Sequence, residues 1–146
     1  MVRAIKRVCF PTAQDAETAF YEAFERADFA AMMNVWAEDE EIACVHPGGP
    51  RLAGYEQVSK SWAAMFDDRE RVRVHLTNQV YTQGMLLAVH SVHENILMSG
   101  EPKARPPIIA TNVYIRTGDG WRMLMHHASA APVPSGTIAD ALKILH

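Results

Sequence analysis

The segment IIATNVYIRTGDGWRMLMHHAS, residues 108–129, predicts two long β-strands joined by a tight turn. Both halves of the segment are rich in β-branched, aromatic and other apolar residues, which favour strands. Between them stands TGDG at 117–120, whose Asp-Gly pair is typical of hairpin turns. The hairpin sets the register of the two strands, and the register decides which side chains share a face of the sheet.

The expected register places Arg116 opposite Trp121 and then pairs Tyr114, Asn112 and Ala110 with Met123, Met125 and His127. His126 and His127 are neighbours on a strand, so their side chains must point to opposite faces. On this register one face combines methionines with the polar residues Asn112, Tyr114, His127 and Ser129. Because a few polar groups in an apolar wall are typical of a small-molecule cavity, we expect His127 to face inward and His126 to face outward.

The chain before this hairpin predicts three further strands. Residues 71–77, RVRVHLT, alternate apolar and polar side chains with the two-residue period of a half-buried strand. A long strand over 85–98 follows a turn at Gly84. A short strand, IACVH, precedes the PGGP loop at 47–50.

Three helices are predicted ahead of the long strands. The first begins at Thr12, where Asp15 completes a capping box, and continues with one apolar stripe. Asp28 caps a second, short helix, and the apolar spacing over 55–66 predicts a third. Helices followed by an antiparallel meander of strands predict an α+β fold.

Neither face of the last three strands is cleanly polar. In the strand over 85–98, apolar residues occupy both sides, with Leu86, Ala88 and Val92 on one and Met85, Leu87 and Val89 on the other. One face covers the helices, and the other would expose apolar strand to solvent, which invites aggregation. We therefore expect a homodimer in which a twofold partner covers the second face.

The composition predicts one cytoplasmic domain over 1–146. The chain is 49% hydrophobic and 21% charged, with a formal net charge of −3, and the N-terminus lacks the long apolar stretch of a signal peptide. Without a basic stripe, nucleic acid is not expected as a partner, and no apolar run approaches the ~20 residues that a membrane helix needs. In the tail at 132–146, TIADALKILH could form a short helix.

No recognisable metal or cofactor motif is present, and no cofactor is expected. The chain has seven histidines, but no HExxH motif, carboxylate triad or fixed Cys/His spacing. One alternative stays open, a metal cluster assembled from His46, His75, His93 and His127.

Nucleophilic and acid–base motifs are also weak in the sequence. Cys44 lies in the apolar run IACV with no activating neighbour, so we interpret it as a buried small hydrophobe. In HSVHE, His90 and Glu94 share a face of the strand. Four residues along a strand separate side chains by ~13 Å, so the two form no acid–base pair by themselves.

Several stretches together resemble the SnoaL-like branch of the nuclear transport factor 2-like superfamily. They are ADFAAMMNVWAED at 27–39, HPGG at 46–49, LAGYEQVSKSW at 52–62 and DGWRMLMHHAS at 119–129. The last stretch also resembles the end of the calmodulin-dependent kinase association domain. The resemblance covers about 13–131, the expected core of the domain. It implies a cone, in which a curved antiparallel sheet wraps around N-terminal helices and encloses a largely apolar cavity. It also implies a homodimer that pairs through its sheets.

For the site, the resemblance favours His127 and Ser129, which match the family's His-x-Ser strand ending. His127 is therefore the candidate general acid/base. The candidate ligand-binding residues are Trp36, His46, Trp62, Asn112, Tyr114, Met125 and Ser129. The two tryptophans are also expected in the core, and His46 either lines the cavity or holds the backbone of its loop.

Three functions stay open at this point. The preferred prediction is a module that binds a small hydrophobic molecule without turnover, because the expected cavity offers orienting groups but no matched acid–base pair. The first alternative is an isomerase-, dehydratase- or cyclase-like reaction that uses a cavity histidine as general acid/base. The Asp/Tyr/Asp constellation of ketosteroid isomerase cannot be matched to this chain. The second alternative is a protein-assembly domain.

Overall fold

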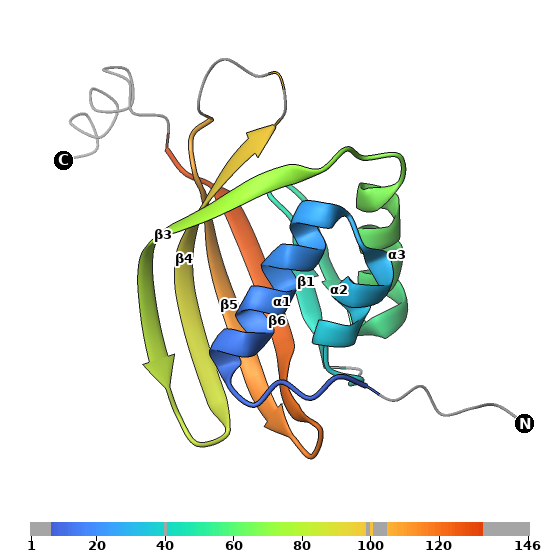
Figure 1. The fold of residues 1–146 in the computed structure, drawn as a ribbon, viewed down its shortest axis with the longest axis vertical. Coiled ribbons are helices and arrows are strands. Elements are labelled where there is room, and N and C mark those ends of the chain that lie inside the picture. Colours follow the sequence, from blue (N-terminus) through green and yellow to red (C-terminus); the bar gives the residue numbers. More distant parts are fainter. Residues whose placement is uncertain (1–6, 40, 99, 101–104, 133–146) are drawn as a thin grey trace, which may run out of the picture.

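The computed structural model describes residues 7–39, 41–98, 100 and 105–132, and in it a curved sheet wraps around helix α1 (Figure 1). The helices are α1 (Ala13–Arg26), α2 (Phe29–Val35) and α3 (Gly54–Phe66). The strands are β1 (Ala43–Val45), β2 (Arg51–Ala53), β3 (Val72–Gln83), β4 (Leu87–Met98), β5 (Ile108–Thr117) and β6 (Gly120–Ala130). This arrangement confirms the predicted α+β fold with N-terminal helices packed in a curved sheet. The helix predicted near the C-terminus falls in 133–146, outside the described residues.

Local capping sets where the first two helices begin. Thr12 and Asp15 exchange side-chain and backbone hydrogen bonds, which confirms the predicted capping box of α1. The Asp28 side chain accepts the Ala31 N–H at the start of α2, as expected. Between the two helices, Ala27 adopts a left-handed conformation with φ of 52°, which ends α1 and turns the chain directly into α2.

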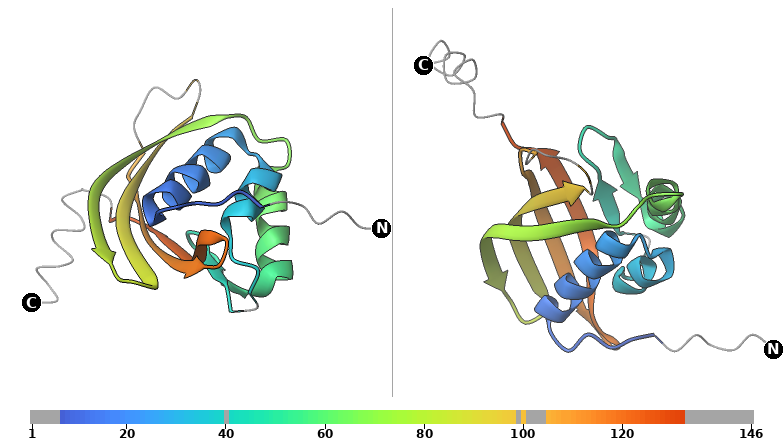
Figure 2. Two further views of the ribbon diagram at one scale, coloured as in Figure 1. Left: turned by 60° about the horizontal axis from the view of Figure 1, so that its bottom comes forward. Right: turned by 45° about the horizontal axis from the view of Figure 1, so that its top comes forward.

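The sheet has the strand order β2-β1-β6-β5-β4-β3. The four long strands form the predicted antiparallel meander. Two features were not predicted: RLA at 51–53 forms the edge strand β2, and β1 pairs with β6 in parallel. In both views of Figure 2, β3 curls around α1, so that α1 occupies the hollow of the sheet. We call the side of the sheet that faces α1 the inner face and the opposite side the outer face.

A bulge in β6 changes the register of the β5–β6 hairpin. Arg116 lies opposite Trp121 and Tyr114 opposite Met123, as expected, but Val113 then lies opposite Met125. Leu124 is the extra residue, and a bulged residue shifts the alternation of every side chain that follows it. Beyond the bulge, therefore, the inner and outer positions of β6 are the reverse of those predicted.

Large apolar side chains fill the space between the helices and the inner face. The fully buried ones include Phe20, Met32, Trp36, Trp62, Tyr114 and Met123. The outer face is different, because apolar side chains on it are exposed to solvent. They include Val80, Leu87, Val89 and Met125.

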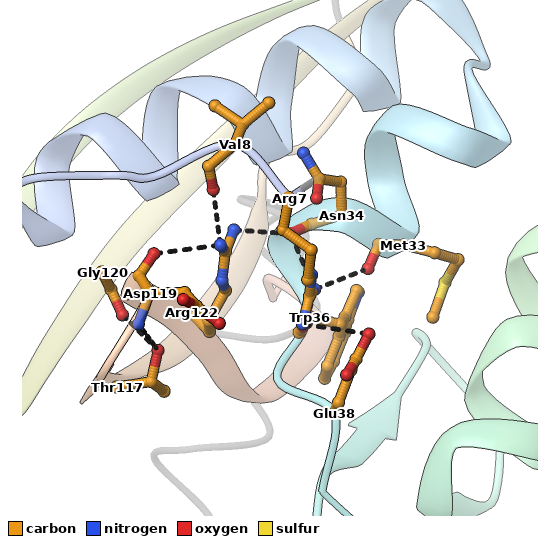
Figure 3. A network of polar contacts seen from close by, with 10 residues as sticks. All are labelled: Arg7, Val8, Met33, Asn34, Trp36, Glu38, Thr117, Asp119, Gly120 and Arg122. Atoms are coloured by element: carbon orange, nitrogen blue, oxygen red, sulfur yellow. Dashed lines mark hydrogen bonds and ion pairs between the residues drawn. The ribbon is translucent and has the colours of Figure 1, made fainter. Parts of the chain in front are cut away.

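Two arginines fasten the C-terminal end of α2 to its surroundings (Figure 3). Arg7 donates to the carbonyls of Met33, Asn34 and Trp36. Arg122 of β6, which is 1% exposed, donates to the carbonyls of Val8, Asn34 and Asp119. The last carbonyls of a helix have no partner within the helix and carry partial negative charge, so a guanidinium satisfies them and the helix dipole together.

Replacing Arg122 by Met should therefore destabilise the fold. The aliphatic part of the side chain is kept, but the carbonyls of Val8 and Asp119 lose the Arg122 donor and that of Asn34 keeps only Arg7, and we expect a loss of about 2–4 kcal/mol in the free energy of unfolding. Chemical denaturation of Arg122→Met measures this loss. The matched control is Arg116→Met, which removes an exposed guanidinium from β5. Equal losses in the two variants would show that the contacts of Arg122 do not stabilise α2.

Candidate functional site

A row of mostly polar side chains crosses the inner face of the sheet. Residues opposite one another on successive strands, from β2 to β3, are Leu52, Cys44, His126, Asn112, His90 and Tyr81. Helix α1 lies over the middle of the row (Figure 1). Asn112, His90 and His126 are all buried, although polar residues in a core are uncommon. The row is therefore the candidate functional site.

The middle of the row belongs to a chain of buried hydrogen bonds. Asn112 donates its amide N–H to the Tyr21 hydroxyl, 2.8 Å away, and Tyr21 donates to Glu94 at 2.6 Å. Asn112 Oδ1 lies 2.6 Å from His126 Nδ1. Because this amide oxygen can only accept, His126 carries a proton on Nδ1. All donors in the chain therefore point from His126 towards the Glu94 carboxyl group.

Burial changes the acid–base behaviour of this chain. It raises the pKa of the Glu94 carboxyl to about 7, and the hydrogen bond from Tyr21 opposes that shift only in part. Burial lowers the pKa of His126 to about 3, with smaller contributions from the neighbouring His46 and His127. At neutral pH the His126 ring is therefore uncharged, whereas Glu94 exchanges a proton with its surroundings.

The end of the row at β3 is next to an imidazole–carboxylate pair. His90 Nδ1 lies 2.7 Å from Glu17 Oε2, and the Tyr81 hydroxyl donates to Glu17 Oε1 at 2.6 Å. Glu17 is one helical turn before Tyr21, so α1 supplies a partner to each of the two clusters. His90 and Glu94 do not contact each other, as predicted from their spacing, because each is paired with a residue of α1 instead.

Aromatic rings surround His126 on the side of α3. The His126 ring centroid lies 5.0 Å from that of Phe20 and 5.9 Å from that of Trp62. His46 lies against Trp62, with ring centroids 4.8 Å apart, and its Nε2 is 3.1 Å from the Ser61 hydroxyl. Burial lowers the pKa of His46. The part of the row next to α3 is thus mainly apolar and uncharged.

Cys44 is buried in the row, in agreement with the sequence interpretation. Burial raises the pKa of its thiol to about 12, so the nucleophilic thiolate is not populated at neutral pH.

The predicted orientations of His127, Met125 and Ser129 are wrong. All three side chains are exposed on the outer face, and Met125 is 39% exposed. The physical cause is the bulge at Leu124, which moves His126 to the inner face in place of His127. His127 does not reach the interior and therefore cannot act there.

The other predicted site residues do lie on the inner side. Trp36, Trp62, Asn112 and Tyr114 are fully buried, and His46 is half-buried beside Trp62. The His46 ring packs against Trp62, and the backbone carbonyl of the residue accepts the Gly49 N–H of the loop. Their roles in ligand binding stay predictions.

Glu17 and Tyr21 were missed by the sequence analysis. A glutamate is not expected on the apolar stripe of a helix, yet Glu17 is only 7% exposed. The available signal was its spacing, because Glu17 lies three residues before Phe20 and four before Tyr21 and must share their face. His126 was considered but assigned to the outer face.

Four buried polar atoms of inward side chains form no hydrogen bond within the part of the chain that the structure describes. They are Trp36 Nε1, Trp62 Nε1, His90 Nε2 and Tyr114 Oη. Burial, with added repulsion from the Glu17 charge, raises the pKa of Tyr114 well above its ordinary value, so its hydroxyl keeps its proton. Unpaired buried polar groups are rare in proteins. Those of Trp62, His90 and Tyr114 lie in or beside the row, whereas Arg69 Nε and Arg122 Nε are unpaired away from it.

Two surface pockets lie away from this row. One, of about 170 Å³, lies beside α1 and α2 and includes Phe10 and Ala23. The other, of about 310 Å³, lies between Arg71, Arg73 and Leu97 at the edge of the sheet. Neither pocket is lined by a predicted site residue.

Among the described residues, no group of three or more His, Cys, Asp or Glu side chains is placed to hold a metal ion. The four-histidine cluster left open above does not form, because His46 lies inside whereas His75 and His127 are exposed on the outer face. No helix in the described ranges is both long and apolar enough to span a membrane.

Comparison with known proteins gives a consistent picture. The family model described as "SnoaL-like domain" matches residues 14–134. F-box protein SKIP8 of Arabidopsis thaliana is 25% identical over 120 residues, which are 77% of this chain and 46% of that protein. The chain therefore spans about half the length of this curated relative.

Solved structures share the fold over most of the chain. A Thiobacillus denitrificans protein assigned as a calcium/calmodulin-dependent protein kinase type II association domain is 41% identical, with a TM-score of 0.81 over 87% of this chain and 100% of its own. A Streptomyces avermitilis protein of the NTF2-like family, assigned as a dehydratase, is 36% identical, with a TM-score of 0.73 over 81% of this chain and 92% of its own. A Parabacteroides distasonis protein assigned as a ketosteroid isomerase is 18% identical, with a TM-score of 0.68 over 84% of this chain and 89% of its own, and shows likeness of fold alone.

The raised pKa of Glu94 predicts that this residue lowers stability as the pH rises. Between the ordinary pKa of 4.5 and the folded value of about 7, the unfolded chain releases the Glu94 proton more readily than the folded chain does. Stability is therefore lost through this window and stays low above it. In Glu94→Gln the loss should disappear, so the stability of the variant relative to the original chain should rise by about 3 kcal/mol from pH 4.5 to pH 8.

Chemical denaturation of the original chain and of Glu94→Gln at each pH measures the difference in their free energies of unfolding. The titration of His126 contributes equally to both proteins and drops out of this difference. Glu70→Gln, which changes an exposed carboxyl, serves as the control. A Glu94→Gln difference that does not change with pH would contradict the buried, raised-pKa carboxyl.

Proposed function

Because the chain belongs to the family of SnoaL-like domains, we propose that it binds a small, mostly apolar organic molecule on the inner face of its sheet. The observation that carries this proposal is that three buried polar atoms in or beside the row, Trp62 Nε1, His90 Nε2 and Tyr114 Oη, form no hydrogen bond with any described residue. A buried donor or acceptor without a partner costs about 1–3 kcal/mol. Polar groups of a bound molecule would remove that cost, which supports binding at this place.

The charges around the row favour a neutral ligand. His126 is uncharged at neutral pH, and Glu94, with its pKa near 7, is protonated for part of the time. Aromatic rings of Phe20 and Trp62 supply apolar contact area next to His126. A molecule with an apolar ring or chain and one or two uncharged polar groups fits this combination best.

An isomerase-, dehydratase- or cyclase-like reaction is the second candidate, and one specific observation favours it. Two carboxyl groups, of Glu17 and Glu94, are buried in the same interior with hydrogen-bond partners that can move protons. Binding alone does not require buried acids, whereas a buried carboxyl group can serve as the acid or base in general acid–base catalysis. The dehydratase assignment of the Streptomyces avermitilis neighbour agrees with this candidate.

We further propose that two chains pair through their outer faces. Val89, Val113 and Met125 lie opposite one another on three adjacent strands and form an apolar row on that face. Val89 and Met125 are 37% and 39% exposed in the single chain. A self-complementary apolar sheet face is what a twofold dimer would cover. The assembly role in the assignment of the Thiobacillus denitrificans neighbour supports this second proposal.

Small neutral ketones, alcohols and aromatic compounds should raise the unfolding temperature if the interior binds such molecules. A ligand at one hundred times its Kd stabilises the folded state by about 2.7 kcal/mol. A thermal-shift screen identifies the ligand, and isothermal titration gives its Kd. His126→Gln should weaken binding because it removes a ring that packs against Trp62. The neighbouring variant His127→Gln is the matched control and should bind as the original chain does. Equal effects of both variants would contradict binding on the inner face.

The double variant Val89→Asp/Met125→Asp should convert a dimer into a monomer. Two carboxylates per chain would face each other across the twofold interface, and burying them without partners is strongly unfavourable. Light scattering coupled to size-exclusion chromatography measures the mass. The control double variant, Ala63→Asp/Ala64→Asp, adds the same charge to exposed positions of α3 and should leave the dimer intact. A monomeric original chain at micromolar concentration would refute the pairing.

A further inference from the structure

The Glu17–His90 pair has the geometry of a buried base held in position by a carboxylate. Glu17 Oε2 lies 2.7 Å from His90 Nδ1, and Glu17 Oε1 accepts the Tyr81 hydroxyl at 2.6 Å. A carboxylate can only accept hydrogen bonds, so His90 carries its first proton on Nδ1. The lone pair of the neutral ring is then on Nε2, the nitrogen that can take up a second proton.

Two complementary polar atoms lie next to each other beyond this pair. His90 Nε2 and Tyr114 Oη are both buried and form no hydrogen bond with any described residue. The two rings belong to adjacent strands, and their centroids are 4.9 Å apart. One of the two atoms accepts a proton and the other donates a hydrogen bond, which is the combination that a hydroxyl group on a ligand would use.

We propose that Glu17, His90 and Tyr114 form a proton-transfer site for a neutral apolar molecule that carries an acidic hydroxyl, of the phenol or enol type. The site rests on the proposed function, because it needs a molecule bound on the inner face. The O–H bond of the molecule breaks and its electron pair stays on the oxygen. The proton forms an N–H bond at His90 Nε2, and the Tyr114 hydroxyl donates a hydrogen bond to the oxygen that is left. The Glu17 carboxylate balances the positive charge of the imidazolium.

His90 is better suited to this task than His126. The Nδ1–H of His126 faces the neutral amide of Asn112, which offers no charge to stabilise an imidazolium. Burial also lowers the pKa of His126 to about 3, which makes it a weak base. His90 instead faces a carboxylate, the arrangement that orients an imidazole and stabilises its protonated form.

Tyr81 separates the pair from solvent. Its ring lies over His90, with the centroids 4.0 Å apart and an interplanar angle of 30°, and the residue is 39% exposed on the edge strand β3. The base is therefore one side chain below the surface. Desolvation by this cover strengthens the electrostatic contact between Glu17 and a protonated His90.

The test uses two ultraviolet-absorbing probes, 4-nitrophenol and 4-nitroanisole, in the second of which a methyl group replaces the transferable proton. Each is titrated into the full chain at a pH at which free 4-nitrophenol is neutral. We expect bound 4-nitrophenol to show the absorbance of its phenolate, and its binding to weaken at least tenfold in His90→Gln. Binding of 4-nitroanisole, which has no proton to give, should be the same in both proteins. His75→Gln, on the outer face, is the matched control and should behave as the original chain.

A second variant keeps the test independent of folding. Tyr114→Phe removes a hydroxyl that makes no hydrogen bond, so its unfolding temperature should be unchanged or higher, while binding of 4-nitrophenol weakens about tenfold. The proposal is overturned if bound 4-nitrophenol stays neutral, or if neither variant changes its binding. In those cases, binding of 4-nitroanisole still upholds the proposed function. If the original chain binds neither probe and no compound of the thermal-shift screen, both proposals fail together.

Discussion

The burial of polar groups between α1 and β4 is the constraint around which the interior is organised. The hydrogen bonds Glu17–His90 and Tyr21–Glu94 join residues with the same separation of 73 positions along the chain. Two positions one turn apart on a helix lie about 6 Å apart, whereas four positions on a strand span about 13 Å. Helix α1 can place Glu17 against His90 and Tyr21 against Glu94 at the same time only at one position and one crossing angle to the strand. A buried polar group that loses its hydrogen-bond partner destabilises the fold. These contacts therefore select a single arrangement of helix and sheet.

The sequence predicted most of the fold because each element had its own local determinant. The capping residues Thr12 and Asp28 marked the helix starts, and the two-residue period marked the strands. The edge strand β2 was missed because three residues carry almost no periodic pattern. Its strand conformation comes from pairing with β1, a tertiary contact that the local sequence does not reveal.

The candidate site was harder to predict because it depends on contacts between distant elements. Single residues such as Trp62 and Asn112 were placed correctly, since each follows the alternation of its own element. The role of Glu17 could not be seen, because its hydrogen-bond partners His90 and Tyr81 lie 73 and 64 residues further along the chain. The choice between His126 and His127 failed for a different reason. The correct choice depends on whether every residue of β6 pairs with β5 or one residue is left over as a bulge. A bulge leaves no clear mark in the sequence.

That bulge has a consequence for how the two ends of β6 can vary. Trp121, next to the hairpin turn, and His126, at the candidate site, belong to the same strand. The extra residue Leu124 lies between them, so the inward–outward alternation of side chains after it is independent of the alternation before it. Removing Leu124 either restores regular pairing, with His126 still opposite Asn112, or keeps a bulge at Met125 and brings His127 to that inner position. In both cases the hairpin, the Arg122 contacts and the pairing of Tyr114 stay as they are. Adjacent identical side chains make such an exchange conservative in chemistry, because a histidine faces inward in either phase. The double histidine therefore makes the chemistry of the inner face insensitive to length changes in a strand whose register is interrupted.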